Sequence, residues 1–279
     1  MQKKYQVGVV ILNWNNWPDT KICIDFLKKS ISNSDNLIIV VDNGSSDDSV
    51  ENLRELKDIV LLESKSNLGF SGGCNLGIKY CVDHFCDYIV LLNNDAVVSK
   101  DTILHMLSAM QRYRNRALIG SIVFNHDGSI QSAGMKINKI TGRVEAYKQF
   151  NVMNRIDYIT GCCLLLPINF ISEVGYFDDN FFLYWEDADL SIRANLAGYK
   201  LVIDPQSMVF HKDSASTKDN PYIKELYYNL SQLLFMKKHH YTRLALTNVF
   251  FRLIKCLMFG EWVRLRAVVD VWFLGKRKL

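Results

Sequence analysis

The chain has 279 residues, of which 49% are hydrophobic and 22% are charged. These proportions are those of ordinary globular proteins, so the disordered and fibrous classes of protein are excluded. A chain of this length can bury a sizeable core, either as one large α/β domain or as one domain with an appendage.

The net charge of +4 combines two unlike parts of the chain. Residues 232–279 contain ten lysines and arginines and two acidic residues, a net charge of +8. Residues 1–231 contain 23 basic and 27 acidic residues, a net charge of −4. An acidic body followed by a basic, apolar tail predicts that the two parts meet different partners.

The cysteines and the apolar stretches bear on the cellular compartment. The seven cysteines are an odd number and include no Cys-x-x-Cys pair typical of a zinc site. The first apolar stretch, 7–12, is too short for the h-region of a signal peptide. No stretch reaches the roughly 18 uncharged apolar residues of a transmembrane helix. We therefore expect a protein of the reducing cytoplasm whose thiols behave as small hydrophobes.

Strand and helix signals alternate through the first half of the chain. Short β-branched apolar runs, typical of strands buried on both faces, occupy 7–12, 37–41, 59–62 and 88–92. Helices are expected at 19–29, 49–56, 74–82 and, capped by Asp101, up to about 113, with a glycine-rich loop at 67–73. This order predicts a parallel sheet covered by helices on both faces.

The pattern changes in the second half. Strands are expected at 117–124 and 135–147, as antiparallel additions to the sheet. Another apolar strand is expected at 158–166, and short strands are expected at 201–203 and 208–210. An aromatic-rich loop at 177–185 leads into a helix at 187–197, which Gly198 ends. From Tyr222 onward the pattern is helical. We expect an α/β domain over 1–220, with a mixed, mainly parallel sheet flanked by helices, and a C-terminal amphipathic helical appendage over 221–279.

Polar residues follow the carboxyl ends of the predicted strands, where ligands of open parallel sheets bind. Asn13 follows the first strand, Asp42 the second, and Asn93-Asn94-Asp95 the fourth. A single aspartate at such a place is also explained as a turn or capping residue. Asp95 suits a hard cation, because Mg²⁺ and Mn²⁺ are held by one or two carboxylates and the substrate's phosphates.

Three further segments are candidates for chemistry. The glycine-rich loop offers backbone N–H groups to a nucleotide, but it is neither a Walker A loop nor a dinucleotide fingerprint. Glu186, Asp187 and Asp189 begin a helix beside several aromatic residues; this suits a sugar or base pocket, and helix capping is the alternative. His211 follows a short strand, as a structural residue or as a neutral imidazole that completes a metal site.

Seven motifs in order carry a resemblance to a known family. They are VVILNWNN (9–16), IVVDNGSSDDS (39–49), NLGFSGGCNLGI (67–78), LLNNDAVV (91–98), ITGCCLLLP (159–167), VGYFDDNFFLYWEDADLSIRANLAGYKLV (174–202) and HKDSAS (211–216). Over about residues 7–216 the chain resembles family 2 glycosyltransferases of the Rossmann-like GT-A fold. Within them, it resembles bacterial rhamnosyltransferase-like members.

The resemblance implies a role for each matched residue. Asp187 would be the catalytic base. Asp95, the last residue of a degenerate DxD motif, would bind Mg²⁺ or Mn²⁺, and His211 would approach the metal or the diphosphate. The donor-binding residues would be Asn13, Asp42, Asn67, Gly69, Gly72, Asn94, Gly161 and Glu186.

This chain departs from the family pattern at two positions. Asn93 replaces the first aspartate of the DxD motif, which lowers the ligand charge of the metal site. Pro167 stands where relatives often carry a basic residue, which places a phosphate contact there in doubt.

The resemblance also implies the reaction. A sugar would move with inversion from a nucleotide diphosphate donor, dTDP-L-rhamnose or a UDP-sugar, to a saccharide acceptor, lipid-linked, in surface polysaccharide or O-antigen assembly. A sugar-1-phosphate nucleotidylyltransferase would instead need a basic glycine-rich loop after the first strand, where this chain has Asn13-Trp14-Asn15-Asn16. A non-catalytic nucleotide-sugar-binding scaffold is the third alternative; Asp95 and Asp187 speak against it.

The tail predicts two helices with basic and apolar faces. Asn248, Arg252 and Lys255 would share one face of the first helix, and Gly260 would separate it from a second at about 261–274. Trp262, Trp272 and the basic residues 276–278 suit a lipid headgroup region, which favours peripheral association with the cytoplasmic face of the inner membrane. A helical cap on the body, or the face of a homodimer, is the alternative. No nucleic acid is expected, because a large apolar face interrupts the basic residues.

Overall fold

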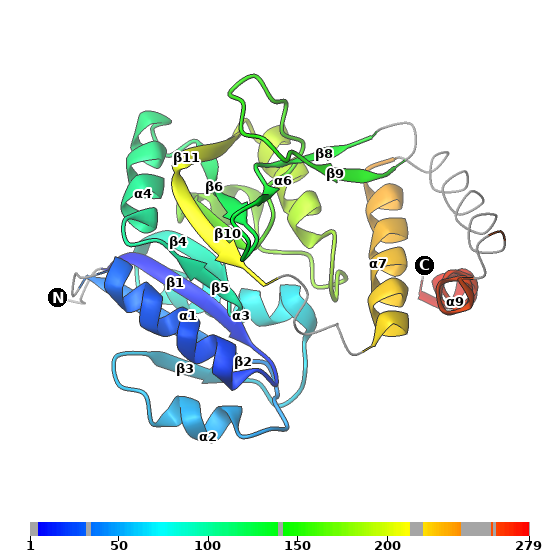
Figure 1. Ribbon diagram of the computed structural model, residues 1–279, viewed down its shortest axis with the longest axis horizontal. Coiled ribbons are helices and arrows are strands. Elements are labelled where there is room, and N and C mark those ends of the chain that lie inside the picture. The colour runs from blue at the N-terminus through cyan, green and yellow to red at the C-terminus, as the bar shows by residue number, and fades with distance from the viewer. Residues whose placement is uncertain are drawn as a thin grey trace.

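The computed structural model describes residues 5–31, 35–138, 142–212, 220–240, 258 and 261–278. Within these ranges, nine strands form one mixed sheet in the order β3-β2-β1-β4-β10-β6-β11-β5, with β7 paired to β6. Helices lie on both faces of this sheet (Figure 1). The predicted α/β class is confirmed.

The first half of the sheet is parallel, as predicted. Its strands are β1 (Tyr5–Asn13), β2 (Asn36–Asp42), β3 (Val60–Glu63) and β4 (Cys86–Asn93). β1 pairs in parallel with β2 and β4, and β2 pairs in parallel with β3. The register sets Asn13 opposite Asp42 and Leu12 opposite Asn93. The polar strand ends therefore meet at one edge of the sheet.

Two apolar layers hold the helices to the sheet, because successive strand residues face opposite sides. Val9 and Ile11 pack in the layer under α1 (Trp17–Ser30), α2 (Ser49–Arg54) and α4 (Thr102–Arg112). Val10 packs in the layer under α3 (Gly69–Asp83), α5 (Asn169–Val174) and α6 (Glu186–Leu196).

Helix α3 begins earlier than the sequence predicted. The glycine-rich loop expected at 67–73 is wrong from Gly69 onward, because the helix starts there. Glycines let this helix lie very close to β1: a Cβ on Gly73 would stand 2.3 Å from Leu12 Cδ1, and one on Gly77 would stand 2.3 Å from Val10 Cγ1. These two glycines serve helix–strand packing.

The second half of the sheet mixes directions. Its strands are β5 (Ala96–Val98), β6 (Ala117–Phe124), β7 (Ile130–Ser132), β10 (Cys163–Pro167) and β11 (Lys200–His211). The antiparallel pairing expected for 117–124 is right for β6 with β10 and with β7. β10 is also antiparallel to β4, and β11 to β5. The expected pairing is wrong for β6 and β11, which are parallel to each other.

Several predicted boundaries in this half are also wrong. The two short strands expected at 201–203 and 208–210 form the single strand β11, with an irregularity in its pairing between Asp204 and Met208. The strand expected at 158–166 begins only at Cys163. The segment 135–147 divides into β8 (Met135–Ile137) and β9 (Val144–Ala146), which form a separate two-stranded sheet.

Of the two helix ends predicted from capping residues, the one at Gly198 is confirmed and the one at Asp101 is confirmed only in position. Asp101 is at the N-cap position of α4, but its side chain makes no capping hydrogen bond. Gly198 follows the C-cap of α6 in the left-handed region, with φ +82°, as a helix-ending glycine should.

Helix α7 (Pro221–Lys238) packs on the body of the protein. Asn220 caps it by accepting a hydrogen bond from the Ile223 N–H at 3.1 Å. Its residues Phe235 and Met236 share a buried cluster with Phe181 and Trp185. The β8–β9 hairpin reaches the same helix in both ribbon views, and Gln232 donates from it to the backbone oxygen of residue 142 (Figure 1).

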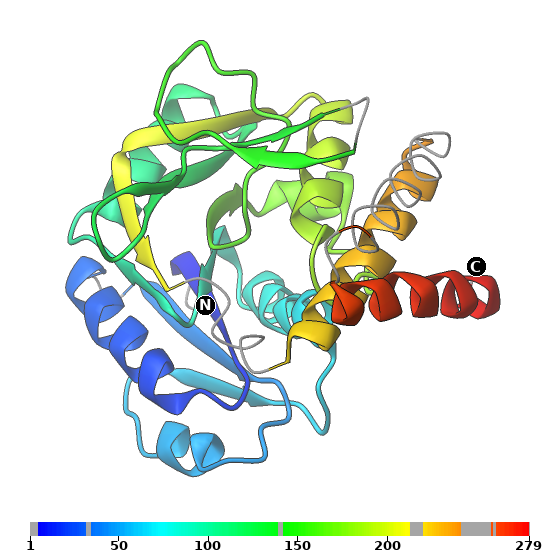
Figure 2. The ribbon, with the colours of Figure 1, turned by 45° about the vertical axis from the view of Figure 1, so that its right-hand side comes forward.

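Helix α9 (Trp262–Lys278) is held by α7 and projects beyond it (Figure 2). Arg264 pairs with Glu225 at 2.9 Å, and Tyr222 donates to Asp270 at 2.5 Å. The predicted helix face of Asn248, Arg252 and Lys255, like the break at Gly260, lies outside the described residues. Within the described residues, no helix is long and apolar enough to cross a membrane.

Candidate active site

Asn13 and Asp42 are joined at the ends of β1 and β2. Asn13 Nδ2 donates to Asp42 Oδ2 at 2.8 Å, as their places opposite each other in the register allow. The Asp42 carboxylate also accepts the Ser45 hydroxyl at 2.6 Å and the Ser45 N–H at 2.9 Å. Asp42 is buried, and these three hydrogen bonds fix its orientation. The Asp42 carboxylate is thereby held in one orientation at the carboxyl ends of the parallel strands.

Thr20 connects Asn94 to this pair. Its hydroxyl donates to Asn13 Oδ1 at 2.6 Å and accepts from Asn94 Nδ2 at 2.9 Å. Thr20 lies in the first part of α1, within no motif of the sequence, so nothing in the sequence marked it as part of the site.

Asn43 joins the second strand end to the start of α3. Its side chain donates to Asn67 Oδ1 and to the Gly69 carbonyl, each at 3.0 Å, and accepts from the Leu68 N–H at 3.0 Å. Asn43 follows Asp42 within the IVVDNGSSDDS motif, but it was not among the candidate residues predicted from the sequence. Asn67 and Gly69 are thus brought to the same edge as Asp42.

The glycines at the start of α3 have different surroundings. Gly69 has φ +74°, and a Cβ there would stand 2.3 Å from the Phe182 carbonyl oxygen, which accepts the Phe70 N–H at 2.7 Å. A Cβ on Gly72 would meet Leu68 at 2.8 Å and Asp179 at 3.9 Å. Gly72 therefore does not lie beside Asn43. The neighbouring Gly73 does, because a Cβ on Gly73 would stand 3.2 Å from Asn43 Nδ2.

Asp95 and His211 face each other because β5 and β11 are antiparallel. His211 pairs with Ala96, which puts Asp95, the preceding residue, beside it. His211 Nε2 lies 3.1 Å from Asp95 Oδ1, and both side chains are largely buried, with 11% and 7% of their surface exposed. Strand pairing thus joins two residues that are 116 positions apart in the chain.

Two amide side chains contact the ring of His211. Gln131 Oε1 lies 2.9 Å from Nδ1, and Asn93 Nδ2 lies 3.1 Å from Nε2. Burial lowers the pKa of His211, but the neighbouring Cys162 and Asp95 outweigh this effect and raise the pKa to about 11. The imidazole is therefore cationic beside Asp95 when no other cation is there.

The donor atoms at Asp95 and His211 fit a divalent metal. Within the described part of the chain, no three His, Cys, Asp or Glu residues are grouped to hold one. The carboxylate and the imidazole supply two ligands, and Mg²⁺ characteristically takes the rest of its shell from water and substrate phosphates. A cation here would displace the Nε2 proton and take over the contact with Asp95.

Asp187 is held at the start of α6 by backbone donors. The Gly161 N–H donates to Oδ2 at 3.2 Å, and the Ala188 N–H donates to Oδ1 at 2.8 Å. Burial raises the pKa of Asp187 to about 6, and these hydrogen bonds limit the rise. A carboxylate with this pKa is ionised at neutral pH and is basic enough to accept a proton from a hydroxyl in the transition state.

Glu186 is the more deeply desolvated of the two adjacent acids. Its side-chain atom Oε2 is buried without a hydrogen-bond partner. Burial, followed by the charge of Asp187, raises its pKa well above the usual range. Burial therefore disfavours the ionised form of Glu186 more strongly than that of Asp187.

Asp189 is tied up in ion pairs and is unsuited to act as the base. Oδ2 accepts from Arg193 at 2.8 Å, while Oδ1 contacts Lys238 at 2.8 Å and His239 at 2.9 Å. Burial raises its pKa, but the hydrogen bonds from His239 and Lys238 and the charge of Arg193 outweigh this and lower the pKa to about 2. Asp189 fastens α6 to the end of α7.

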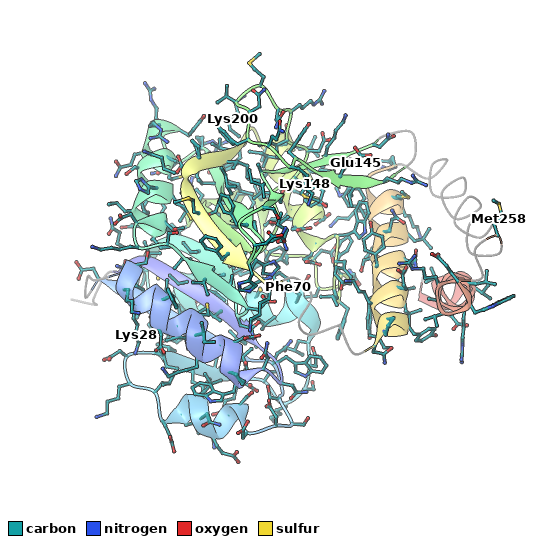
Figure 3. The ribbon with its side chains drawn as sticks, in the orientation of Figure 1. Lys28, Phe70, Glu145, Lys148, Lys200 and Met258 are labelled. Atoms are coloured by element: carbon teal, nitrogen blue, oxygen red, sulfur yellow. The ribbon has the colours of Figure 1, made fainter. Side chains whose placement is uncertain are left out.

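Short contacts across the start of β10 connect the Asp95–His211 pair to Asp187. The Asn93 N–H donates to the Cys162 carbonyl at 2.9 Å, one residue after Gly161, which holds Asp187. Phe70, labelled in Figure 3, lies in that view between the end of β11 and α7. A Cβ on Gly161 would stand 3.2 Å from its ring. The sites predicted for the metal, the donor and the base are thus linked by short contacts at one edge of the sheet.

Comparison with known proteins identifies the family. The sequence model described as Glycosyl transferase family 2 matches residues 8–175, which is more than half of the chain. The chain belongs to glycosyltransferase family 2. The resemblance seen in the motifs is thereby confirmed.

Two curated relatives of this family 2 glycosyltransferase carry specific names. N-acetylglucosaminyl-diphospho-decaprenol L-rhamnosyltransferase of Mycobacterium tuberculosis is 25% identical over 233 residues, which cover 73% of this chain and 75% of the relative. Low-salt glycan biosynthesis hexosyltransferase Agl10 of Haloferax volcanii is 28% identical over 199 residues, which cover 67% of this chain and 61% of the relative. The family 2 chain is thus similar to a rhamnosyltransferase.

Solved structures share the fold. Mannosyltransferase PcManGT from Pyrobaculum calidifontis, in complex with GDP-Man and Mn²⁺, superposes with a TM-score of 0.62 at 12% identity, covering 98% of this chain and 76% of that one. GalNAc-T7 with UDP, GalNAc and Mn²⁺ superposes with a TM-score of 0.65 at 12% identity, covering 85% of this chain and 48% of that one. The predicted GT-A fold is confirmed.

Proposed function

We propose that this family 2 glycosyltransferase moves L-rhamnose, with inversion, from dTDP-L-rhamnose to a lipid-linked saccharide acceptor in surface polysaccharide or O-antigen assembly. The observation that carries the proposal is the placement of Asp187, fixed by Gly161, next to the strand ends that hold Asp95 and His211. The similarity to the mycobacterial rhamnosyltransferase supports the sugar and the acceptor class. A UDP-sugar is the second candidate donor.

The proposed reaction needs one base and a stabilised leaving group. Asp187 takes the proton of the acceptor hydroxyl as its oxygen attacks the anomeric carbon. The bond from that carbon to the diphosphate breaks on the opposite face, so the configuration inverts. Mg²⁺ or Mn²⁺, held by Asp95 and His211, would neutralise the charge that grows on the diphosphate.

The remaining residues of the proposed donor site bind and orient the nucleotide sugar. The fixed carboxylate of Asp42 offers an acceptor for hydroxyl or imide groups of the nucleoside, with Asn13 and Asn94 in support. Asn67 and Gly69 close the site from the start of α3. Gly161 leaves room for the sugar beside Phe70, and Glu186, whose buried Oε2 has no hydrogen-bond partner among the described residues, offers a polar contact to it.

We propose that the catalytic α/β domain spans 1–220 and that the helical region 221–279 attaches it to a lipid surface. Trp262 and Val263 on α9 are 69% and 51% exposed, and the sequence of this region is rich in lysine and arginine. Exposed apolar side chains in a segment of basic sequence suit the headgroup layer. This supports a peripheral place on the cytoplasmic face of the inner membrane. A homodimer through the same helix is the competing use of this surface.

One experiment tests the proposed function. Thermal unfolding of the full chain is followed with dTDP-L-rhamnose, UDP-sugars and GDP-mannose, each with and without Mn²⁺, and sugar release from any stabilising donor is then measured. We expect Mn²⁺-dependent stabilisation and slow donor hydrolysis, both lost in EDTA. Stabilisation without turnover would support the scaffold instead. Formation of a nucleotide sugar from a sugar phosphate and a nucleoside triphosphate would support the nucleotidylyltransferase.

A further inference from the structure

We propose that Gln131 is a positioning residue of the donor site, through the two ends of its side-chain amide. Its oxygen holds His211 with Nε2 turned to Asp95, and its nitrogen donates to an oxygen of the bound donor. The inference rests on the proposed function, since it assumes that a metal and a nucleotide diphosphate bind at Asp95 and His211.

The sheet brings Gln131 to His211 from a remote part of the sequence. Phe124 of β6 pairs with Ile130 of β7 and with Phe210 of β11. Gln131 and His211 each follow one of these partners, so they meet across the end of β6. Gln131 Oε1 lies 2.9 Å from His211 Nδ1.

This contact decides which ring nitrogen of His211 faces Asp95. A carbonyl oxygen accepts only from a protonated nitrogen, so Nδ1 carries a hydrogen as long as Gln131 Oε1 is there. Nε2, 3.1 Å from both Asp95 Oδ1 and Asn93 Nδ2, is then the nitrogen whose lone pair binds a cation, in place of its contact with Asn93. Histidines that bind metals are commonly oriented in this way by an outer hydrogen-bond acceptor.

The other end of the amide is unused. Gln131 Nε2 is buried and has no hydrogen-bond partner within the described structure. Buried donors are nearly always satisfied, so an unsatisfied one beside a site calls for a partner that arrives with the ligand. The two amide atoms are bonded to the same carbon, which keeps this donor close to the ring of His211, whose Nε2 contacts Asp95. An oxygen of the diphosphate or of the sugar supplies the missing acceptor.

The backbone of Gln131 is held independently of this side chain. Its carbonyl accepts from Lys148 Nζ at 2.9 Å, and its neighbours Ile130 and Ser132 pair with β6. Lys148 is labelled in Figure 3. Substitutions of the side chain therefore leave the strand pairing in place and test the amide itself.

Two variants separate the two ends of the amide. Gln131→Glu keeps an oxygen for His211 Nδ1 and removes the nitrogen donor, whereas Gln131→Met removes both. Gln149→Met, at an exposed position, is the matched control. Calorimetry of the full chain measures the binding of dTDP, and of dTDP-L-rhamnose, in Mn²⁺ and in EDTA.

We expect Gln131→Met to weaken Mn²⁺-dependent dTDP binding by about 10- to 100-fold, the usual effect of losing an outer partner of a metal ligand. The ¹⁵N spectra of histidine-labelled protein with Mg²⁺ and dTDP report the tautomer of His211, whose signals are identified by their loss in His211→Asn. Wild type and Gln131→Glu should show the Nδ1–H form, and Gln131→Met should lose it. Gln131→Glu should weaken dTDP binding at least fivefold if the phosphate is the acceptor. It should weaken only dTDP-L-rhamnose binding if the sugar is.

Unchanged dTDP affinity and an unchanged His211 tautomer in Gln131→Met would overturn the inference. The proposed function fails separately, by a different result: wild-type protein that binds neither nucleotide in Mn²⁺. Loss of binding in Gln149→Met as well would show that the effect is general destabilisation, and would also count against a specific role for Gln131.

Discussion

The backbone N–H of Gly161 donates to Oδ2 of Asp187 over 3.2 Å. This hydrogen bond joins the segment before β10 to the first turn of α6, elements separated by 26 positions in the chain. It leaves the carboxylate able to accept a proton, because it draws on only one of the lone pairs of that oxygen. The carboxylate proposed as the base is thereby held at a fixed distance from Gly161, the glycine proposed to border the donor sugar.

Replacing Asp187 by Asn should abolish turnover and spare donor binding. The Asn side-chain oxygen can still accept one backbone N–H, so the start of α6 keeps its shape, but the amide takes no proton. A positioned general base contributes about 10²- to 10⁴-fold, and we expect a loss of that size in kcat. Nucleotide release assays and calorimetry with the donor measure the two effects. Near-normal turnover would move the role of base to Glu186, since the oxygens of Asp189 are occupied.

The rate should depend on pH through Asp187. Burial raises the pKa of this carboxyl to about 6, and only the ionised form accepts a proton. kcat/KM should therefore fall about tenfold for each pH unit below 6 and reach a plateau above it. The profile is measured between pH 4.5 and 8 at saturating Mn²⁺, with circular dichroism to verify folding at each pH. A flat profile between pH 5 and 7 would contradict this assignment.

Asp189 should contribute strongly to stability. Its side chain is fully buried among Arg193, Lys238 and His239, and removal of one partner of a buried ion pair costs about 3–5 kcal/mol. Because the cations here remain partly exposed, we expect Asp189→Asn to lower the free energy of unfolding by about 2–3 kcal/mol. Asp83→Asn, at an exposed helix end, should change it by less than about 0.5 kcal/mol.

The contribution of Asp189 has a defined pH window. The folded-state pKa is lowered to about 2 from the ordinary 3.8, so the stabilisation is complete above about pH 4 and is lost as the pH falls toward 2. Urea unfolding of wild type and Asp189→Asn should give a constant difference from pH 7 to pH 5 and a smaller one at pH 3. A difference that grows on acidification would show the opposite sign and refute the ion-pair explanation.

Gly69→Ala should lower the free energy of unfolding more than Gly128→Ala, although both substitutions place a Cβ in the left-handed backbone region. Gly69 and Gly128 have φ +74° and +82°, so each pays about 1–2 kcal/mol for a Cβ in the left-handed region. Only at Gly69 does the Cβ also strike the Phe182 carbonyl, and this should cost about 1–3 kcal/mol more. Urea unfolding measures the difference, and calorimetry should show weaker nucleotide binding in Gly69→Ala alone. Equal losses of unfolding free energy in Gly69→Ala and Gly128→Ala would contradict the close contact between Gly69 and the Phe182 carbonyl.

The exposed apolar residues of α9 should bind a lipid surface. Trp262→Ser combined with Val263→Ser should reduce sedimentation with anionic liposomes at least several-fold, because both side chains are more than half exposed. Leu104→Ser on α4, where Leu104 is 59% exposed, is the matched control on the catalytic body. Unchanged sedimentation, together with a dimer in analytical ultracentrifugation that the double variant breaks, would assign the surface to a second copy of the chain.

The parallel half of the fold was predictable because its signals are local. Strands β1 to β4 are continuous apolar runs, and helices with turn residues separate them. The spacing of the apolar residues and the turn residues between the runs therefore identify each element. The second half was predicted less well. β5 and β7 have three residues each, too few for a periodic pattern, and whether β6 runs parallel to β11 depends on the path of the chain between them.

The sequence by itself determined the family and the identity of most candidate residues, since seven ordered motifs carry Asn13, Asp42, Asp95, Asp187 and His211. Only the tertiary structure showed that Asp189 is held in ion pairs, which favours Asp187 as the proposed base. Asp187 and Asp189 are alike in the sequence, but α7 brings Lys238 and His239 to Asp189 alone. The structure also placed Gln131 against His211. Sequence spacing carries no record of such contacts, because the pairing of strands and the docking of helices bring together residues that are distant along the chain.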